Sequence, residues 1–403
     1  MNRVSDAESW GWKPEFHASW AAAMEQQGEG KRILPARVTA RGHHRYEVII
    51  PDLRGRPGFP DCPGLAGIHE NVAVSGRFRY DAEDPEDYPV VGDWVLVDPD
   101  EDSIRIRSVL HRRSALTRGR AGRESGGQVL AANIDTLLLV FALDGGRNFL
   151  PRLLERSLVV ARNSGAAPCI ILNKADLASE EDRERAFLEA AYAAPSVPVL
   201  AVSAKTGEGL EDLRARLSPG ETIGMLGKSG VGKSALVNAL ARRGRDEPGH
   251  DEGLRKTGIS SPASDESARE GRVRPGDLRG RHTTTTSRLY RLASGLLLID
   301  GPGIRELKIW GGVEGLEEGF PELAALAGRC RFKDCSHSGE PGCAVLEALD
   351  SGELEPSRYL SYLELSRERD RLEKRTDERA RREDERKWKQ ISKQRKALKQ
   401  SGW

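Results

Sequence analysis

The stretch Gly227–Ser234 constrains the fold of this chain most, because it reads Gly-Lys-Ser-Gly-Val-Gly-Lys-Ser and fits G-x-x-x-x-G-K-[ST] throughout. A short apolar run, Thr222–Leu226, precedes it, and Ala235–Leu240 follows with helical spacing. A loop in this context turns backbone N–H groups toward a phosphate chain. We predict a nucleotide site in which Lys233 reaches the β and γ phosphates and Ser234 binds Mg²⁺. The alternative is a chance glycine turn, which the two matching flanks disfavour.

Strand and helix patterns alternate from residue 132 onward. Three runs are apolar on both faces, as a parallel sheet covered by helices requires. They are Thr136–Ala142, Pro168–Leu172 and Pro198–Val202, with helices expected over 150–160 and 209–217. The sequence therefore predicts a central α/β domain.

Polar loops follow two of these strands, Asn173-Lys-Ala-Asp176 after the second and Ser203-Ala-Lys205 after the third. The first loop alone is a weak signal, and Asp176 would serve equally as a helix cap. Together, at strand ends where open α/β sheets bind ligands, the two loops form a base-reading pair. Asp176 can accept hydrogen bonds from N1–H and the 2-amino group of guanine, which adenine does not offer. We therefore predict GTP rather than ATP.

Two further segments are expected to sense the γ-phosphate. Arg281-His-Thr-Thr-Thr-Thr286 lies where a first switch belongs, and Asp300-Gly-Pro-Gly303 follows a buried strand. One threonine of 283–286, with Thr284 as the candidate, would complete a magnesium shell with Ser234 and Asp300, directly or through water. The position after Asp-x-x-Gly is Ile304, which cannot hydrogen-bond water.

His282, beside the switch threonines, is the nearest group able to orient water or accept its proton. We predict that it is the catalytic group. The alternative is a loop histidine that packs on the first switch.

A cysteine and histidine cluster, Cys330-x₄-Cys335-x-His337-x₅-Cys343, lies near the C-terminus. Three thiolates and an imidazole make a closed tetrahedral site for one structural Zn²⁺. The chain has 5 cysteines in 403 residues, too few for a disulfide scaffold. The alternative, cysteines packed as small hydrophobic side chains, fits poorly in so polar a segment.

The region from Ile33 to about Leu110 reads as short alternating strands, for which a closed barrel of the OB type is the leading candidate. Arginines alternate with apolar residues in two of these strands and would share exposed faces. They make either a solvated surface or an RNA surface. The expected strands are Arg37–Ala40, Tyr46–Ile50, Val72–Tyr80, Asp93–Val97 and Ser103–Arg107, and the arginines are Arg77, Arg79, Arg105 and Arg107.

Charge and hydropathy limit the partners. The net charge is only +1, so any nucleic-acid surface must be local. In the charged tail from Ser357 to Trp403, residues 386–399 contain no acid, which favours contact with phosphates, although a solvated helix is the simpler interpretation. No run approaches about 18 apolar residues and the N-terminus lacks a signal-peptide core. We expect a soluble cytoplasmic protein with no membrane partner.

The order of the motifs is unusual, because the base-reading loops precede the phosphate loop. The sheet is therefore expected to be circularly permuted, with the helix at 209–217 joined to the strand before Gly227. In this order and in its motifs the chain resembles the ribosome small-subunit-dependent GTPase A family, the circularly permuted GTPases of small-subunit maturation. The shared motifs are Gly92-Asp-Trp94, Gln128 with Ala131-Ala-Asn133, Asn173–Asp176, Gly227–Ser234, Gly280-Arg-His-Thr-Thr284, Asp300–Gly303 and the cysteine cluster. Departures are an insertion within Gly244–Gly280, Gly301 in place of Thr or Ser, and the extended basic tail.

The resemblance implies a multidomain GTP hydrolase that assists late assembly of the small ribosomal subunit as a monomer, binds its rRNA and is stimulated by it. The alternative is a nucleotide-gated RNA-binding regulatory module with incidental hydrolysis. The expected domains are 1–32 (extension), 33–112 (OB-like barrel), 113–312 (permuted P-loop GTPase), 313–356 (α-rich zinc module) and 357–403 (basic helical tail). Residues assigned to GTP or GDP are Asn173, Lys174, Asp176, Ser203, Ala204, Lys205, Gly227, Lys228, Ser229, Gly230, Val231, Gly232, Lys233, Ser234, Ala235, Thr283, Thr284, Asp300 and Gly303.

Overall fold

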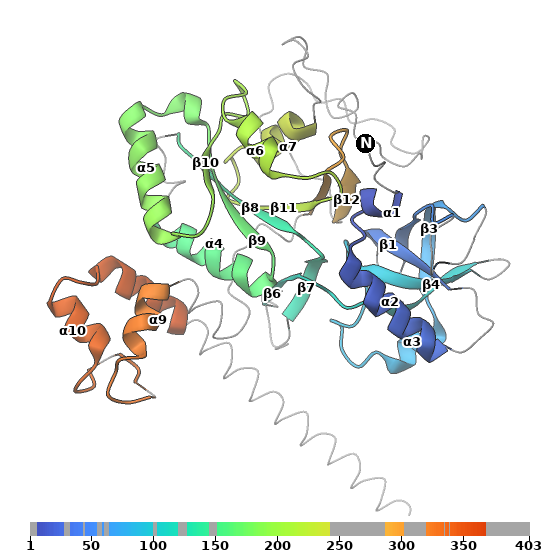
Figure 1. The fold of residues 1–403 in the computed structure, drawn as a ribbon, viewed down its shortest axis with the longest axis horizontal. Coiled ribbons are helices and arrows are strands. Elements are labelled where there is room, and N and C mark those ends of the chain that lie inside the picture. Colours follow the sequence, from blue (N-terminus) through green and yellow to red (C-terminus); the bar gives the residue numbers. More distant parts are fainter. Residues whose placement is uncertain are drawn as a thin grey trace, which may run out of the picture. The chain divides into compact units, whose positions relative to one another are not determined.

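The computed structural model describes residues 6–27, 33–42, 45–54, 59, 64–99, 103–119, 127–144, 151–241, 287–301, 320–333, 335–337 and 339–367. The chain divides into two compact units (Figure 1). The first comprises Met1–Leu116 with Val129–Leu307, and the second comprises Thr117–Gln128 with Lys308–Trp403. The finer domain boundaries expected above remain predictions.

A closed five-stranded barrel forms the N-terminal part of the first unit, as predicted. Its strands follow the order β1-β2-β3-β5-β4, and β4 pairs back onto β1. Alternate residues such as Val38, Val48 and Val95 fill its interior. The strands are β1 (Leu34–Arg41), β2 (Tyr46–Ile50), β3 (Gly67–Val74), β4 (Trp94–Pro99) and β5 (Ile104–Val109).

The strand predicted over Val72–Tyr80 is wrong in its second half. β3 ends at Val74, and helix α3 (Gly76–Asp81) follows. The Ser75 hydroxyl caps this helix by accepting a 3.1 Å hydrogen bond from the Phe78 backbone N–H, and Phe78 enters the barrel core. Arg77 and Arg79 therefore lie exposed on a helix and do not share a strand face with Arg105 and Arg107.

The N-terminal segment forms two helices, α1 (Asp6–Ser9) and α2 (Pro14–Gln27). Gly11, with φ +81°, breaks the helix between them. Trp12 and Phe16 then pack against Trp94 on the outer face of the barrel, with the Trp12 and Trp94 ring centroids 4.7 Å apart. This segment is therefore part of the folded core.

The second sheet of the first unit has the order β10-β9-β8-β11-β13-β12, with all pairings parallel except that of β12 with β13. The helices α4 and α5 cover one face and α6 and α7 the other (Figure 1). The strands are β8 (Thr136–Ala142), β9 (Ala167–Asn173), β10 (Val199–Ala201), β11 (Thr222–Leu226), β12 (Arg288–Arg291) and β13 (Leu297–Asp300). The helices are α4 (Pro151–Ser164), η1 (Ala175–Leu177), α5 (Glu180–Ala193), α6 (Leu210–Arg216) and α7 (Lys233–Ala241), and β6 (Ala115–Gly119) and β7 (Gly127–Ala132) form a separate pair.

The barrel and this sheet are continuous, because Ala40 of β1 pairs with Arg288 of β12. Arg37, on the outer side of β1, is 1% exposed at the junction. Its guanidinium donates to the carbonyl oxygens of Trp10, Gly92 and Asn133 and, at 2.9 Å, to the Thr222 hydroxyl. Burial lowers the pKa of Arg37 to about 10, so the group stays charged at neutral pH. One side chain thus joins the N-terminal segment, the barrel and the strand before the phosphate loop.

The described part of the second unit contains two short helices, α9 (Pro321–Ala327) and α10 (Ala344–Asp350). Residues 356–367 are also helical, and the remainder of the predicted helical tail lies outside the described residues. None of the described helices is both long and apolar enough to cross a lipid bilayer.

Candidate functional site

The carboxyl ends of five parallel strands meet at one edge of the second sheet of the first unit. Because β10, β9, β8, β11 and β13 run in the same direction, the residues that end or follow them share this edge. Asn173 ends β9, Ser203 follows β10, Gly227 follows β11 and Asp300 ends β13. The predicted base-reading loops and the predicted phosphate loop therefore lie along one edge.

The loop after β11 has the backbone that a phosphate cradle needs. Gly232 has φ +94°, and a Cβ there would lie 2.4 Å from the Asn173 side-chain nitrogen. Residues Lys228, Ser229 and Gly230 are exposed at the tip, while Val231 is buried. The Lys233 ammonium donates to the carbonyl oxygens of Gly227 at 2.6 Å and Lys228 at 2.7 Å, so it lies over the loop. This places its charge beside the N–H groups that face a bound phosphate.

Asn173 holds three loops together. It is 1% exposed, its amide nitrogen donates to the Val231 carbonyl at 2.8 Å, and its amide oxygen accepts from the Ala204 N–H at 3.2 Å. The amide thus links its own loop to the phosphate loop and to the Ser203–Lys205 loop. Asn173 therefore has a structural role, because its side chain holds the three loops together.

Asp176 has one carboxylate oxygen engaged by the protein. The buried Ser203 hydroxyl donates to Oδ1 at 2.7 Å, which fixes the carboxylate. The neighbouring Lys174 has φ +63°, and its ammonium pairs with Asp144 at 2.7 Å. Asp144 follows β8 and was missed in the sequence, where no motif marks it.

Two oxygen donors at this edge suit a hard divalent cation. Ser234 lies exposed in the first turn of α7, and Asp300 lies exposed at the end of β13. Gly224 pairs with Ile299, so Asp300 lies one residue nearer the phosphate loop on the adjacent strand. Hydroxyl and carboxylate oxygens are the ligands that Mg²⁺ accepts beside phosphates. His282, Thr283, Thr284 and Gly303 lie outside the described residues.

The predicted zinc ligands converge in the second unit. The ligand atoms of Cys330, Cys335, His337 and Cys343 all lie within 4.8 Å of one another. The Cys330 Sγ lies 3.6 Å from His337 Nδ1 and 3.9 Å from Cys343 Sγ. Tetrahedral zinc with bonds of about 2.0 to 2.3 Å needs ligand atoms about 3.5 to 3.8 Å apart, which these separations match closely. The donor set and its spacing fit one Zn²⁺ with no open position.

Neighbouring groups orient the histidine of this cluster. His337 is 6% exposed, and burial lowers its pKa, which favours the neutral imidazole that a metal binds. The Tyr359 hydroxyl donates to the His337 carbonyl oxygen at 2.6 Å. Arg358 pairs with Glu322 and lies 4.5 Å from the Phe320 ring centroid, which connects the following helix to α9. The metal ligands are thus built into the core of this unit.

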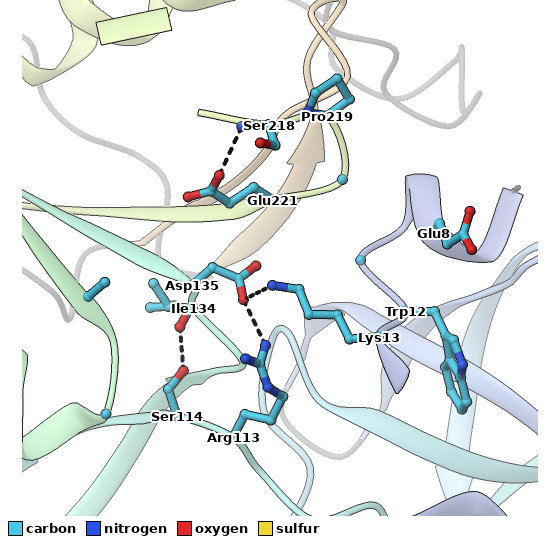
Figure 2. A pocket seen from close by; sticks show the side chains of 14 residues that line it. Glu8, Trp12, Lys13, Arg113, Ser114, Ile134, Asp135, Ser218, Pro219 and Glu221 are labelled. Atoms are coloured by element: carbon cyan, nitrogen blue, oxygen red, sulfur yellow. Dashed lines mark hydrogen bonds and ion pairs between the residues drawn. The ribbon is translucent and has the colours of Figure 1, made fainter. Parts of the chain in front are cut away.

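A polar cavity of about 580 Å³ lies at the opposite edge of the sheet, where β8 and β11 begin. Figure 2 shows Lys13 and Arg113 both directed at Asp135, with ion pairs of 2.5 and 2.9 Å. Glu221, on another wall, accepts from the Ser218 N–H at 2.9 Å. Because the carboxylates of Glu8, Asp135 and Glu221 outnumber the two cations in its lining, the cavity is poorly suited to a phosphate chain. The edge at the carboxyl ends of the parallel strands, called the nucleotide edge below, is the better candidate for a phosphate chain.

Two motifs of the resemblance build the junction between barrel and sheet. Gly92 has φ +93°, and a Cβ there would lie 2.1 Å from the Ala132 carbonyl oxygen. Asn133, with φ +55°, donates to the Gly92 carbonyl oxygen at 3.0 Å and accepts from the Arg113 N–H at 2.9 Å. The motifs alone assign no role to Gly92 or Asn133. The available signal is the residue type, because glycine and asparagine adopt the left-handed backbone of turns more readily than other residues.

Comparison with known proteins identifies close relatives. A family model described as RsgA GTPase matches residues 109–310. A protein named small ribosomal subunit biogenesis GTPase RsgA from Opitutus terrae is 38% identical over 394 residues, covering 95% of each chain. One of the same name from Streptomyces avermitilis is 42% identical over 79% of this chain and 81% of its own.

Solved structures show the same fold. The crystal structure of YjeQ from Thermotoga maritima superposes with a TM-score of 0.55 at 27% identity, covering 83% of this chain and 97% of that one. The structure of YloQ, titled a circularly permuted GTPase, gives a TM-score of 0.53 at 23% identity over 86% and 96% of the two chains. The predicted circular permutation is therefore confirmed at the level of the fold.

Proposed function

Since the chain belongs to the RsgA GTPase family, we propose that it hydrolyses GTP during the maturation of the small ribosomal subunit. Its relatives are named GTPases of small ribosomal subunit biogenesis, and they align over most of this chain. The chain is accordingly a GTP hydrolase, and the family resemblance noted in its sequence is confirmed.

The observation that carries the proposal is the network around Asn173. Its two amide hydrogen bonds bring the loop that ends in Asp176, the Ser203–Lys205 loop and the phosphate loop to one edge. A site that joins a guanine-reading carboxylate to a phosphate cradle suits GTP.

We assign roles within this site as follows. The loop backbone from Gly227 to Ser234 and Lys233 hold the phosphates, and Asp176 reads the guanine edge. Ser234 and Asp300 bind Mg²⁺, directly or through water, together with Thr284. When bound, the cation neutralises charge on the phosphates. His282 orients the attacking water, because Ile304 cannot.

The partner in this proposal is the small ribosomal subunit with its rRNA. The barrel, the cysteine cluster unit with one structural Zn²⁺, and the acid-free segment 386–399 supply the contacts. Lysine and arginine in that segment favour RNA phosphates. The protein acts as a cytoplasmic monomer that binds GTP and releases GDP.

Turnover with and without purified small subunits tests the proposal. Basal hydrolysis is expected to be slow, and docking should raise it by positioning the catalytic groups. His282→Ala should lose about a hundredfold of the stimulated rate while it keeps GTP binding. His111→Ala, which removes an exposed histidine elsewhere, is the matched control.

The outcomes separate the alternatives. A His282→Ala variant stimulated as strongly as the wild type would remove His282 from the mechanism. A wild-type protein that subunits do not stimulate would favour the nucleotide-gated RNA-binding module with incidental hydrolysis.

A further inference from the structure

A row of charged side chains crosses from the barrel to the nucleotide edge. In the antiparallel pairings, Glu47 of β2 lies opposite Ala40 of β1, Ala40 lies opposite Arg288 of β12, and Arg288 lies opposite Asp300 of β13. Residues directly opposite in antiparallel strands point to the same face, with Cβ atoms about 4.5 to 5.5 Å apart. Arg288 therefore lies between two carboxylates, Glu47 on the barrel side and Asp300 on the nucleotide side.

In the structure, Arg288 forms an ion pair with a carboxylate of the barrel. Its guanidinium Nη1 lies 3.3 Å from the Glu47 carboxylate, whose side chain is only 10% exposed. Asp300, its neighbour on the other flank, is exposed at the edge proposed to bind Mg²⁺. The same guanidinium would reduce the affinity of Asp300 for a cation if it moved to that carboxylate.

A β-bulge fixes the carboxylate that holds Arg288. The register between β1 and β2 shifts between Val38 and Ala40, which makes Thr39 the extra residue. The Thr39 hydroxyl donates to Glu47 Oε1 at 2.7 Å, while Oε2 faces Arg288. Both oxygens of Glu47 are thus engaged, and its orientation is set by the barrel.

We propose that Glu47 is a positioning residue that keeps Arg288 away from Asp300 and so maintains the Mg²⁺ affinity of the nucleotide site. Through this pair, the barrel sets a property of a site built on another part of the sheet. The inference rests on the proposed GTPase function, because it concerns the metal that accompanies the nucleotide.

Equilibrium nucleotide binding during a Mg²⁺ titration tests the proposal without measuring hydrolysis. A fluorescent GDP analogue is bound to the wild type, Glu47→Gln, Arg288→Gln and the double variant. Glu47→Gln should raise the half-saturating Mg²⁺ concentration about two- to fivefold, the range expected for releasing a partly exposed ion pair. Affinity measured in EDTA should be unchanged, which also verifies that the variant folds.

The double variant separates local repositioning from a distant charge effect. With Arg288 replaced by Gln, removing Glu47 should cause no further shift. Thr39→Val, which removes only the hydroxyl that orients Glu47, should shift the Mg²⁺ requirement in the same direction by a smaller factor. Asp98→Asn is the matched control, because Asp98 is a partly exposed barrel carboxylate paired with Arg107 outside the row.

Two results would overturn the inference alone: an unchanged Mg²⁺ requirement in Glu47→Gln, or an equal shift with and without Arg288. A wild-type protein that binds no guanine nucleotide would instead overturn the proposed function, and this inference with it.

Discussion

Asp176 illustrates how a buried neighbour fixes one side chain of a short motif. The Ser203 hydroxyl occupies one carboxylate oxygen at 2.7 Å, so the carboxylate is fixed before any base arrives. Its other oxygen can accept from a guanine N–H. Ser203 therefore acts through Asp176, and its burial excludes water from that hydrogen bond.

Replacing Asp176 with Asn is expected to weaken GTP binding and improve binding of xanthosine triphosphate. The 2-carbonyl of xanthine needs a donor where the guanine amino group needs an acceptor. Loss of a charged hydrogen bond should weaken GTP about tenfold to a hundredfold. Nucleotide titration measures both affinities.

Asp182→Asn, an exposed change on α5, should leave both affinities unaltered. Equal binding of ATP and GTP by the wild type would contradict the assignment of Asp176.

Side chains within local motifs could be predicted from the sequence, whereas those that act across the fold could not. The four zinc-ligand candidates fall within 14 residues, so their spacing alone predicts that they converge. Glu47 and Arg288 are 241 positions apart and belong to no motif. Only the sheet register, which depends on the bulge at Thr39, brings them together.

Two helices of the second unit, α9 and α10, are too short to be stable alone. α9 and α10 have seven residues each, below the length at which isolated helices persist in water. Cys330 follows α9 and Cys343 precedes α10, so a metal between them would tie the two helices together. The fold of this unit is therefore expected to depend on Zn²⁺.

Cys335→Ala should lose the zinc and lower the melting temperature of the second unit while GTP affinity stays near the wild-type value. The mutation removes one of four ligands, and the nucleotide residues belong to the other unit. Metal analysis together with nucleotide titration measures both effects.

Cys169→Ala, a buried cysteine of β9 outside the cluster, is the control for general loss of packing. Purified wild-type protein without zinc would refute the metal assignment.

Elements with sharp polar boundaries were easy to predict. Thr222–Leu226 and Tyr46–Ile50 match β11 and β2, because each apolar run is bounded by polar or turn residues. The strand prediction fails after Val74 because alternating arginine and aromatic residues also suit a short helix with one buried aromatic. Only the cap at Ser75 and the burial of Phe78 decide between them.

A buried charge, Arg37, lies at the junction between the barrel and the second sheet of the first unit. Arg37 reaches the N-terminal segment, the barrel and the strand that leads into the phosphate loop. A buried charge is tolerated when its donors are satisfied. Here the acceptors of its hydrogen bonds lie in three parts of the chain, so loss of Arg37 should loosen all three from one another.

Arg37→Gln is expected to destabilise the first unit by about 2 to 5 kcal/mol, because each buried acceptor left without a donor costs about 1 to 3 kcal/mol. The carbonyl oxygens of Trp10 and Asn133 would lose the hydrogen bonds that Arg37 donates. Urea unfolding should change from one transition for the barrel and GTPase sheet to two.

Arg105→Gln, an exposed barrel change, should leave the transition in place. A single unshifted transition in Arg37→Gln would show that the strand pairing alone joins the two parts.

The pairing between β1 and β12 joins segments that are synthesised far apart in time. Glu47 precedes Arg288 by 241 residues, so at about 5 to 20 residues per second the second emerges roughly 12 to 50 s after the first. The barrel can close early, since its strands span Leu34–Val109. Until β12 is synthesised, the edge of β1 that pairs with it has unpaired main-chain groups. Such groups are a template for pairing with another chain. During translation, a nascent chain can therefore pair at this edge with a strand of a chain on a neighbouring ribosome before its own β12 arrives.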